Sequence, residues 1–456
     1  MKKDMNNLVN FCKKYGFIYQ GSEIYDGLAN TWDYGPLGSI LKNNIKNAWR
    51  HFYIQNNDNS YEVDASILMH PRVWEASGHI SSFSDPLMDC KSCKMRHRAD
   101  KMIEDFTNGD ISGDSMSHDE MHSFIVDNKI VCPNCGKLDY TEIREFNLMF
   151  QTQRGVTKDS KNIVYLRPET AQGQFVNFQN VQRSMRCKIP FGIGQIGKAF
   201  RNEITPGNFT FRTIEFEQME HQLFCKNGQD EEIYDFYKKY ALDFLTSIGL
   251  KKENLRYKDH EKLAHYAKAA CDIEYRFPFG FGEINGTHNR TDYDLSRHKE
   301  YSGQNLEYLD PITNEKFIPF VIESTFGADR LALAVLNEAF TVIEEGEETR
   351  EILKLNPRLA PYKVAVLPLI KKYHSEKGEE VYKLFKKEFM SLYDDAGTIG
   401  KRYRRQDIIG TLYCITIDDN TLNDNIVTIR YRDTMKQISL PVKEAIKYIK
   451  ENIEKY

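Results

Sequence analysis

The sequence predicts an α+β protein with an antiparallel-sheet core, an insertion within that core and a compact α/β domain at the carboxy terminus. Its 456 residues exceed one ordinary hydrophobic core, because a domain holds roughly 100–200 residues. In the middle of the chain, strand-like segments are separated by Gly and Pro turns, a pattern that favours antiparallel pairing. A proline-bearing segment at 356–361 precedes alternating strand and helix patterns. These observations divide the chain into 1–76, 77–144, 145–353 and 361–456.

The composition is typical of a folded protein in a reducing compartment. Hydrophobic residues make up 41% of the chain and charged residues 28%, which argues against long disorder. The polar amino terminus lacks the apolar run of a secretory signal, and no segment reaches the ~18 apolar residues of a membrane span. Nine cysteines, an odd number, do not suggest a disulfide framework. We therefore expect a soluble, cytoplasmic protein without membrane association.

The overall charge does not indicate a nucleic-acid partner, because the net charge is −4 and the pI is about 6.3. Such a partner would have to be recognised by local features. One of them is a basic run around Tyr403, formed by Lys401, Arg402, Arg404 and Arg405. Runs of this kind are also common on solvated surfaces.

An amphipathic helix is predicted near the amino terminus. Leu37, Leu41, Ile45 and Ala48 recur every three or four residues, and Pro36 suits the first turn of a helix. The apolar face packs either on the protein's own sheet or at a subunit interface. Periodicity alone does not separate these two readings.

The insertion at 77–144 has paired cysteines near both ends and a polar, acidic middle. Two CxxC pairs can supply four thiolates for a structural zinc ion, and the residues are Cys90, Cys93, Cys132 and Cys135. The step of 39 positions from Cys93 to Cys132 is longer than the usual ribbon spacing. His97, His118 and His122 remain rival ligands, and buried cysteines without metal remain the alternative.

Local patterns predict the remaining elements. In the core we expect strands at 163–166, 197–201, 209–217 and 317–325, a turn at 206–208 and a helix at 231–248. In the last domain we expect strands at 364–367, 412–417 and 426–431, with helices at 379–389 and from 442 to the end.

The segment 192–197 matches GxGxxG, which would indicate a dinucleotide site if a strand ended and a helix began there. The residues that follow, Lys198 to Glu203, instead lead into a Pro-Gly turn and predict a strand entering a hairpin. We therefore reject this reading. No GxxxxGK[ST] phosphate loop is present either, so a nucleotide would need a different binding site.

Two segments carry the residue types that such a site requires. Arg201 and Glu203 are two positions apart, so on a strand they share a face, and an arginine fork suits a phosphate. Phe211 could stack on a purine. Gly327 permits close approach of a ligand to a helix amino terminus that also carries Arg330. Taken singly, the first segment could equally form an ion pair on a solvated hairpin. The second could equally be an ordinary helix start.

Three segments together resemble motifs 1, 2 and 3 of class II aminoacyl-tRNA synthetases, in chain order. They are Tyr34-Gly35-Pro36-Leu37-Gly38, Phe200-Arg201-Asn202-Glu203 and Gly327-Ala328-Asp329-Arg330. Arg167-Pro168-Glu169-Thr170 resembles the segment of that class that binds the amino acid's ammonium group. The resemblance covers essentially the whole chain and is greatest to the dimeric type of glycyl-tRNA synthetase.

This resemblance implies an ATP-dependent ligase that forms glycyl-adenylate and pyrophosphate and then transfers glycine to the 3′ end of tRNA(Gly). Phosphoryl-centre displacement needs mainly alignment and charge stabilisation. The implied catalytic residues are Arg201 at the α-phosphate, Glu203 at the adenine amino group and Arg330 at the γ-phosphate. Glu283 is the implied ligand for Mg²⁺. The implied ATP site comprises Arg201, Asn202, Glu203, Phe211, Arg212, Thr213, Ile214, Glu215, Phe216, Glu283, Ile284, Gly327, Ala328, Asp329 and Arg330.

The resemblance also implies a glycine pocket in which three carboxylates surround one ammonium group. Its residues are Arg98, Glu169, Phe216, Glu217, Gln218, Met219, Glu220, Glu323, Ser324, Thr325, Phe326 and Gly327. Glycine has no smaller competitor, so steric exclusion suffices for specificity and we expect no editing site in the insertion.

Residues from about 361 onward resemble the class II anticodon-binding domain, so that the basic run would meet tRNA phosphates and Tyr403 would stack on a base. A homodimer is implied because motif 1 packs at the subunit interface in this class. Two alternatives remain: a class II synthetase for threonine, proline, serine or histidine, and a catalytically inactive relative that only binds a partner.

Overall fold

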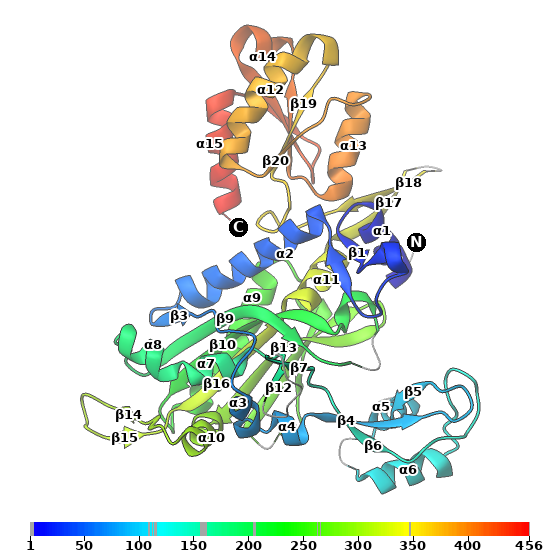
Figure 1. Ribbon diagram of the computed structural model, residues 1–456. Helices are drawn as coiled ribbons and strands as arrows, with labels where there is room; N and C mark the ends of the chain where they lie inside the picture. Colours follow the sequence, from blue (N-terminus) through cyan, green and yellow to red (C-terminus); the bar gives the residue numbers. More distant parts are fainter. Residues whose placement is uncertain are drawn as a thin grey trace.

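The computed structural model describes residues 4–107, 110–111, 113, 116–155, 162–203, 207–261, 263–264, 266–345 and 348–455. A large twisted sheet forms the centre of the molecule, the insertion projects from one side, and the carboxy-terminal domain lies at the opposite end (Figure 1). The predicted fold class is confirmed. Among the described residues, no helix is both long and apolar enough to cross a membrane.

The central sheet has seven strands in the order β11-β12-β13-β16-β10-β9-β3. Every neighbouring pair is antiparallel except β3 and β9, which are parallel. The strands are β3 (Ser60–Glu62), β9 (Phe191–Phe200), β10 (Glu215–Cys225), β11 (Leu255–Asp259), β12 (Ala269–Phe277), β13 (Gly280–Thr291) and β16 (Phe320–Gly327).

Three helical segments cover this sheet with one shared hydrophobic core. They are α2 (Pro36–Trp49), which continues as a π-helical turn at Arg50–Gln55, α9 (Asp230–Ser247) and α11 (Ala328–Ala339). Trp49, Tyr53, Phe244 and Leu331 are fully buried in that core. The periodic face predicted from Leu37 onward therefore packs on the protein's own sheet.

The remaining core elements surround the sheet. They are α1 (Met5–Lys14), β1 (Ile18–Gln20), a 3-10 turn (Glu23–Tyr25), β2 (Trp32–Tyr34), α3 (Pro71–Ala76), α4 (His79–Ser82), β7 (Gln151–Gln153), β8 (Ile163–Tyr165), α7 (Ala171–Val176), α8 (Phe178–Ser184), a 3-10 turn (Lys252–Asn254), α10 (Tyr293–Ser302), β14 (Tyr308–Leu309), β15 (Lys316–Phe317), β17 (Phe340–Glu345) and β18 (Glu348–Leu353).

The glycines of the rejected GxGxxG match lie inside β9, so the segment is a strand and the Rossmann reading is excluded. Side chains cross this strand closely. A Cβ atom added to Gly192 would lie 2.2 Å from the His221 ring. One added to Gly197 would lie 2.2 Å from the Arg167 guanidinium group. These glycines therefore admit neighbouring side chains rather than a pyrophosphate.

Two predicted strands differ from the structure. The expected strand at 209–217 is a 3-10 turn (Phe209–Phe211) followed by β10, because Asn208 and Phe209 adopt left-handed backbone conformations. Of the predicted turn, Gly207 and Asn208 are described and Pro206 lies outside the described residues. The expected strand at 317–325 is divided between β15 and β16 at Pro319, which has no N–H for a sheet.

The insertion has a three-stranded sheet and its own small core. Its elements are β4 (Ser84–Asp89), β5 (Arg96–Arg98), α5 (Ala99–Phe106), α6 (His118–Asp127) and β6 (Arg144–Asn147). Met88, Ile103 and Ile125 are buried together. The four CxxC cysteines lie in the two turns that close this unit.

The carboxy-terminal domain has a mixed five-stranded sheet in the order β20-β19-β21-β22-β23. Its elements are β19 (Val364–Pro368), α12 (Lys371–Glu388), β20 (Ser391–Tyr393), α13 (Ile399–Ile409), β21 (Tyr413–Ile417), α14 (Asp419–Asp424), β22 (Ile426–Tyr431), β23 (Gln437–Pro441) and α15 (Val442–Glu454). Helix α12 begins at Lys371, eight residues before the predicted position 379. Its first turns are polar, so they lack the apolar periodicity on which the prediction relied.

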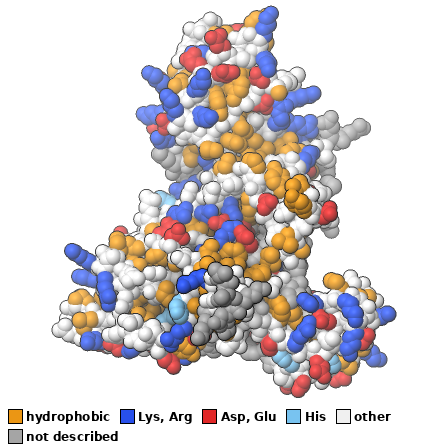
Figure 2. Space-filling view, in the orientation of Figure 1, with side chains coloured by type: hydrophobic (Ala, Val, Ile, Leu, Met, Phe, Trp, Pro, Cys, Tyr) orange, Lys and Arg blue, Asp and Glu red, His pale blue; other side chains and the backbone are white. Residues whose placement is uncertain are grey.

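The linker before this domain is held to the core by hydrogen bonds from a side chain of α2 to the linker backbone. The Asn44 side chain on α2 donates hydrogen bonds to the carbonyl oxygens of Leu359 and Ala360 at 3.1 and 3.2 Å. Figure 2 shows hydrophobic side chains gathered where the domain meets the core.

Candidate active site

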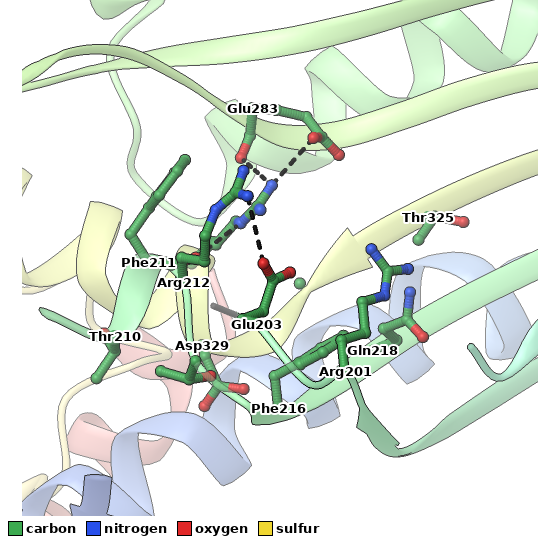
Figure 3. Close-up of a pocket in the computed structure, with 13 residues that line it drawn as sticks. Arg201, Glu203, Thr210, Phe211, Arg212, Phe216, Gln218, Glu283, Thr325 and Asp329 are labelled. Atoms are coloured by element: carbon green, nitrogen blue, oxygen red, sulfur yellow. Dashed lines mark hydrogen bonds and ion pairs between the residues drawn. The ribbon is translucent and has the colours of Figure 1, made fainter. Parts of the chain in front are cut away.

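A pocket opens where β9, β10, β13 and β16 approach the amino terminus of α11 (Figure 3). The strands bring together side chains from segments more than 100 positions apart in the sequence. Its lining residues are Arg201, Glu203, Thr210, Phe211, Arg212, Thr213, Phe216, Gln218, Glu283, Thr325, Gly327, Asp329 and Arg330. From segments 200–203 and 327–330, the cavity is thus lined by Arg201, Glu203, Gly327, Asp329 and Arg330.

Arg201 follows directly after β9 and has room to bind a further ligand. Its Nε atom donates one hydrogen bond, to the Pro168 carbonyl oxygen at 3.0 Å. The guanidinium group also lies over the rings of Phe83 and Phe216, at 5.2 and 5.3 Å from their centroids. Most of its donors therefore remain available for an anion.

Arg330 is more fully occupied than Arg201. Its Nε atom donates to the Phe211 carbonyl oxygen at 3.0 Å, and one terminal nitrogen donates to the Glu283 carboxylate at 3.0 Å. The guanidinium carbon lies 4.4 Å from the centroid of the Phe211 ring. A purine could stack on this face of Phe211 only after the guanidinium group has moved away.

The Phe211 ring is supported from its other sides. It packs edge-on against Phe277 and Phe279, with centroids 5.3 and 5.1 Å away. A Cβ atom on Gly282 would lie 2.6 Å from the ring, so that position must remain without a side chain.

Glu203 lies among the lining residues and accepts a hydrogen bond from Arg212 at 3.4 Å (Figure 3). Behind it, Asp85 of the insertion pairs with Arg98 at 3.0 Å. Burial, together with the carboxylates of Glu203 and Asp100, raises the pKa of Asp85 to about 6 despite Arg98. The insertion therefore adds charged groups at one edge of the pocket.

Three glutamates lie deeper in the site, as the resemblance implied. Thr325 donates its hydroxyl hydrogen toward Glu323 at 3.0 Å and lies 3.3 Å from Glu220, and Thr170 donates to the other oxygen of Glu220. Glu169 precedes α7, and its carboxylate accepts a hydrogen bond from Gln172 at 2.8 Å. Glu220 and Glu323 are only 2% and 4% exposed.

The three carboxyl groups carry different charges. Burial and the neighbouring Glu323 and Glu169 carboxylates raise the pKa of Glu220 to about 8. Burial also disfavours ionisation of Glu323, but Arg290 at 2.8 Å and His288 outweigh it and lower the pKa of that carboxyl. The pKa of Glu169 is likewise lowered, against burial, by His79 and Arg290. These shifts indicate two carboxylates, Glu169 and Glu323, and one largely neutral carboxylic acid, Glu220, at pH 7.

Alternation along the strands turns several expected site residues away from the pocket. Phe216, Gln218 and Glu220 share one face of β10, so Glu215, Glu217 and Met219 lie on the opposite face. Four of the expected site residues are instead buried in the hydrophobic core: Met219, Ile284, Phe326 and Ala328. Ser324 is also buried and bonds to Tyr53 at 3.1 Å. Asn202 and Ile214 do not line the cavity, and their backbone N–H groups bond to Leu148 and Asn30.

Glu217 contributes from behind the pocket instead. Its carboxylate pairs with Lys42 and Lys46 of α2 at 2.7 and 3.0 Å, and Lys42 also contacts Asp329 at 3.3 Å. The Glu217 backbone N–H donates to Asp329 at 2.7 Å. These buried ion pairs join α2, β10 and α11, so a glycine contact is not the role that the structure gives to Glu217.

Arg98 lies in a neighbouring cleft rather than in the glycine pocket. It faces Phe211 and Arg212 across that cleft, together with His97 and Lys101. Its guanidinium group pairs with Asp85 and Asp100. In the described part of the chain, no hydrogen bond or ion pair joins Arg98 to Glu169, Glu220 or Glu323.

Sequence reasoning missed four residues that hold the glutamates in place: Gln172, Arg290, Asp294 and His298. All four are at most 6% exposed. Arg290 and Asp294 are four positions apart in a polar stretch at the end of β13, where no pattern distinguishes a buried ion pair from a solvated turn. A signal was available for Gln172, which stands two positions after the quoted segment Arg167-Pro168-Glu169-Thr170.

Comparison with known proteins agrees with this geometry. Residues 150–339 match the family model of the tRNA synthetase class II core domain (G, H, P, S and T), and residues 363–452 match that of the anticodon binding domain. A glycine–tRNA ligase of Clostridium acetobutylicum is 55% identical over 460 residues, which is 99% of this chain and 99% of the relative. Those of Caldanaerobacter subterraneus subsp. tengcongensis and Clostridium perfringens are also 55% identical, over 100% of this chain and 99% of their own lengths.

The chain belongs to the glycine–tRNA ligase family. The expected resemblance is thereby confirmed, and the alternatives specific for threonine, proline, serine or histidine are set aside. As a class II synthetase, this glycine–tRNA ligase family member uses ATP with Mg²⁺.

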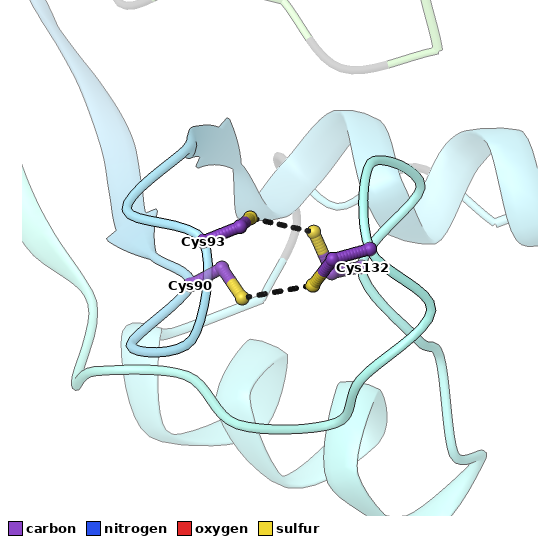
Figure 4. A group of neighbouring side chains, drawn as sticks. Cys90, Cys93 and Cys132 are labelled. Carbon is purple, nitrogen blue, oxygen red and sulfur yellow. Dashed lines mark hydrogen bonds between the residues drawn. The ribbon is translucent and has the colours of Figure 1, made fainter.

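The insertion of this glycine–tRNA ligase holds the four cysteines in one cluster (Figure 4). The Sγ atoms of Cys90 and Cys135 lie 3.6 Å apart and those of Cys93 and Cys132 lie 3.7 Å apart. Both separations are too long for disulfides, whose S–S bonds are about 2.05 Å. A tetrahedron with metal–sulfur bonds of about 2.3 Å has edges of about 3.8 Å, so the donor set fits zinc.

Of the rival histidines, His97 contacts the cluster and His118 does not. The Nε2 atom of His97 lies 3.3 Å from the Cys132 sulfur, a distance that suits a hydrogen bond to a ligand atom. His118 pairs with Glu145 at 2.8 Å.

The basic run of the anticodon-binding domain is largely committed to internal contacts. Arg402 is 2% exposed and donates to the carbonyl oxygens of Pro368 and Gly397, and Arg405 pairs with Asp394. Arg430 covers the Tyr403 ring, with its guanidinium carbon 4.7 Å from the centroid. The interpretation of Arg402 and Tyr403 as tRNA contacts is wrong, because helix α13 turns both inward. Lys401 and Arg404 remain on the surface.

Proposed function

We propose that this chain joins glycine to ATP, forming glycyl-adenylate and pyrophosphate, and then transfers glycine to the 3′ end of tRNA(Gly). The observation that carries the proposal is a pocket with two arginines beside a buried cluster of three glutamates on one sheet. The first half suits a polyphosphate and the second an ammonium group. In such a reaction the protein mainly aligns the reactants and stabilises developing charge.

In the ATP half, Arg201 contacts the α-phosphate and stabilises its charge during displacement. Arg330 leaves Phe211 and binds the γ-phosphate, while the adenine ring takes the vacated face of Phe211. Glu203 addresses the adenine amino group. Glu283, released from Arg330, would hold Mg²⁺, a cation that prefers carboxylate and phosphate oxygens and would neutralise phosphate charge there.

In the glycine half, Glu169, Glu220 and Glu323 surround the ammonium group, and Thr325 orients two of them. The proposed pocket also retains Phe216, Gln218 and Gly327, which face the cavity. No editing site is needed, because a pocket without spare room excludes every larger amino acid. Arg98 would approach the substrate only after its pairs with Asp85 and Asp100 rearrange.

A homodimer is our second proposal, and an exposed apolar patch supports it. Ile24, Tyr25 and Leu28 lie in the turn between β1 and β2 and are 89%, 79% and 57% exposed. Strand β2 leads directly into α2, the motif 1 helix. Exposed large apolar side chains that lie close together in the sequence are consistent with a protein interface. Light scattering should give a molar mass of twice the 53.3 kDa chain mass. In the Ile24→Lys variant, the measured mass should fall toward that of a single chain.

We further propose that the cluster of Cys90, Cys93, Cys132 and Cys135 holds a structural zinc ion. Residues 361–456 would bind the tRNA anticodon. The protein would work in the cytoplasm, where tRNA is charged. The zinc would fix the two turns of the insertion at 77–144. It would not take part in the chemistry, which lies in the core formed by 1–76 and 145–353.

The test of the main proposal is ATP–pyrophosphate exchange with each of the twenty amino acids in turn. Glycine alone should support rapid exchange. Exchange driven best by serine, threonine, proline or histidine would contradict the assignment, and no exchange with any amino acid would favour an inactive relative.

A further inference from the structure

Gln172 lies next to the glycine pocket and has every polar atom of its side chain engaged. It is 0% exposed on the first turn of α7. Its Nε2 atom donates to Glu169 at 2.8 Å and to Asp294 at 3.2 Å, and its Oε1 atom faces Nε2 of His298 at 2.8 Å. A primary amide offers two donors and one acceptor for such a set, so the contacts also fix the orientation of the amide.

The contacts continue from Gln172 to a second glutamate of the pocket. Asp294 receives hydrogen bonds from Arg290 at 2.8 and 3.0 Å, and the same guanidinium group donates to Glu323 at 2.8 Å. Glu169 on the loop before α7 is therefore joined to Glu323 on β16 through one continuous network. Both Asp294 and His298 belong to α10, four residues apart and on one face of that helix.

The neutral charge of Gln172 suits this position. Glu169 must keep a negative charge available for the ammonium group of glycine. A lysine or arginine at the position of Gln172 would pair with that charge. An apolar side chain would remove the 2.8 Å hydrogen bond that orients the carboxylate and leave His79, at 3.6 Å, as a weaker contact. An amide donates a hydrogen bond to the carboxylate while adding no charge that competes with the ligand.

His298 orients the amide in turn. It is 6% exposed and burial lowers its pKa, so the ring is neutral and its Nε2–H donates to Gln172. With the amide oxygen held, the NH₂ group can point only toward the two carboxylates. On its far side, His298 borders a second cavity, which Arg72 and Arg183 also line.

We propose that Gln172, held by His298, is a positioning residue that fixes Glu169 and couples it to Glu323, and so sets both the affinity for glycine and the exclusion of larger amino acids. The inference rests on the proposed role of Glu169 as an ammonium ligand. Loss of the amide should leave Glu169 charged and still 3.6 Å from His79, but without its 2.8 Å hydrogen bond and therefore less firmly oriented. Glycine binding should then weaken, while the ATP half should be unaffected.

The experiment is glycine-dependent ATP–pyrophosphate exchange by Gln172→Met, which keeps the side-chain length and removes all three hydrogen bonds. The KM for glycine should rise about tenfold or more, because a buried charge-assisted contact is lost. The KM for ATP should stay within about twofold, and the ratio of alanine to glycine activation should increase. His298→Phe should act in the same direction with a smaller effect, and it serves if Gln172→Met does not fold. The matched control, Gln182→Met on α8, should leave all these values unchanged.

Glu169→Gln, measured in parallel, separates this inference from the assignment of the site. If Glu169→Gln leaves the KM for glycine unchanged, the proposed glycine pocket fails and this inference fails with it. If Glu169→Gln raises that KM but neither Gln172→Met nor His298→Phe does, the positioning role alone is overturned. An equal loss for glycine and ATP, with a lower melting temperature, would also overturn it, since that is the signature of a packing role.

Discussion

The ATP half and the glycine half of the site differ in how their charged side chains are partnered. Arg201 and Arg330 are half-buried, and their contacts are with carbonyl oxygens, aromatic faces and one carboxylate that a nucleotide can replace. Glu220 and Glu323 are buried within the sheet and held by threonine, arginine and glutamine side chains. In the proposed reaction, the first half rearranges when ATP binds, whereas the side chains of the second half are already held in place by their neighbours.

This difference follows from the location of each half. The ATP half lies where β9 ends, where a 3-10 turn replaces the expected strand and where α11 begins. Side chains at such ends are not confined by neighbours on both sides. The glycine half lies in the middle of β10 and β16, where neighbouring strands and α7 confine every side chain. Broad ligand contact therefore comes from segment ends, and selectivity for a small ligand comes from the sheet interior.

The largest effect is expected from Arg201→Ala, which removes the cation from the reacting phosphate. The adenylation rate should fall by about 10²–10³-fold, the size seen when a preorganised donor to a transition state is removed. Single-turnover formation of glycyl-adenylate measures it. Arg201→Lys is the matched control and should recover only part of the rate, because a lysine lacks the planar fork. A near-normal rate for Arg201→Ala would overturn the role of this residue.

The next effect concerns the pH dependence of glycine binding. Burial and the neighbouring carboxylates raise the pKa of Glu220 to about 8, and an ammonium group between the glutamates would favour its ionised form. Below pH 8, glycine must displace a proton, so its KM should decrease as pH rises, by up to about tenfold per pH unit, and level off above pH 8. The KM for glycine measured from pH 6.5 to 8.5 checks this.

Glu220→Gln provides the control for that measurement. The variant should bind glycine more weakly and should lose the pH dependence, because it has no proton to release. A KM for glycine that rises with pH in the wild type, or an unchanged slope in the variant, would contradict the assignment of the shift to Glu220.

The smallest effect on the chemistry is expected from the cysteine cluster, which lies outside both halves. Metal analysis should find about one zinc per chain, and Cys132→Ser should lower that content and the melting temperature of the insertion. Glycine-dependent exchange should fall less than about tenfold. Cys187→Ser, which changes a cysteine remote from the insertion, should keep its zinc. Purified protein without zinc would overturn the metal assignment.

The sequence predicted more of the ATP half than of the contacts around the glycine half. Arg201, Glu203 and Arg330 stand in local segments whose order along the chain identifies a family, so their meeting in one pocket could be anticipated. Whether a residue on β10 faces the pocket depends on where that strand begins, and left-handed Asn208 and Phe209 delay its start to Glu215. The resemblance placed consecutive residues of β10, including Glu217, in the glycine pocket, whereas the alternation of the strand turns Glu217 to the opposite face.

Long-range partners could not be predicted from local patterns. Arg402 and Tyr403 appear in a basic run that is typical of a solvated or nucleic-acid-binding surface, yet α13 turns them toward Pro368 and Arg430. Gln172 and Asp294 are more than 100 positions apart and meet only because α7 and α10 pack together. Such contacts depend on packing and not on spacing along the chain.

The most direct test of the account is the number of protons released when glycine binds at pH 7, because it measures the charge of the pocket before the ligand arrives. Calorimetric titration of glycine into the protein in two buffers with different ionisation enthalpies gives this number. We expect release of close to one proton per site in the wild type and almost none in Glu220→Gln. A wild-type value of zero would show that all three glutamates are already ionised, and it would contradict the charge distribution on which the glycine half depends.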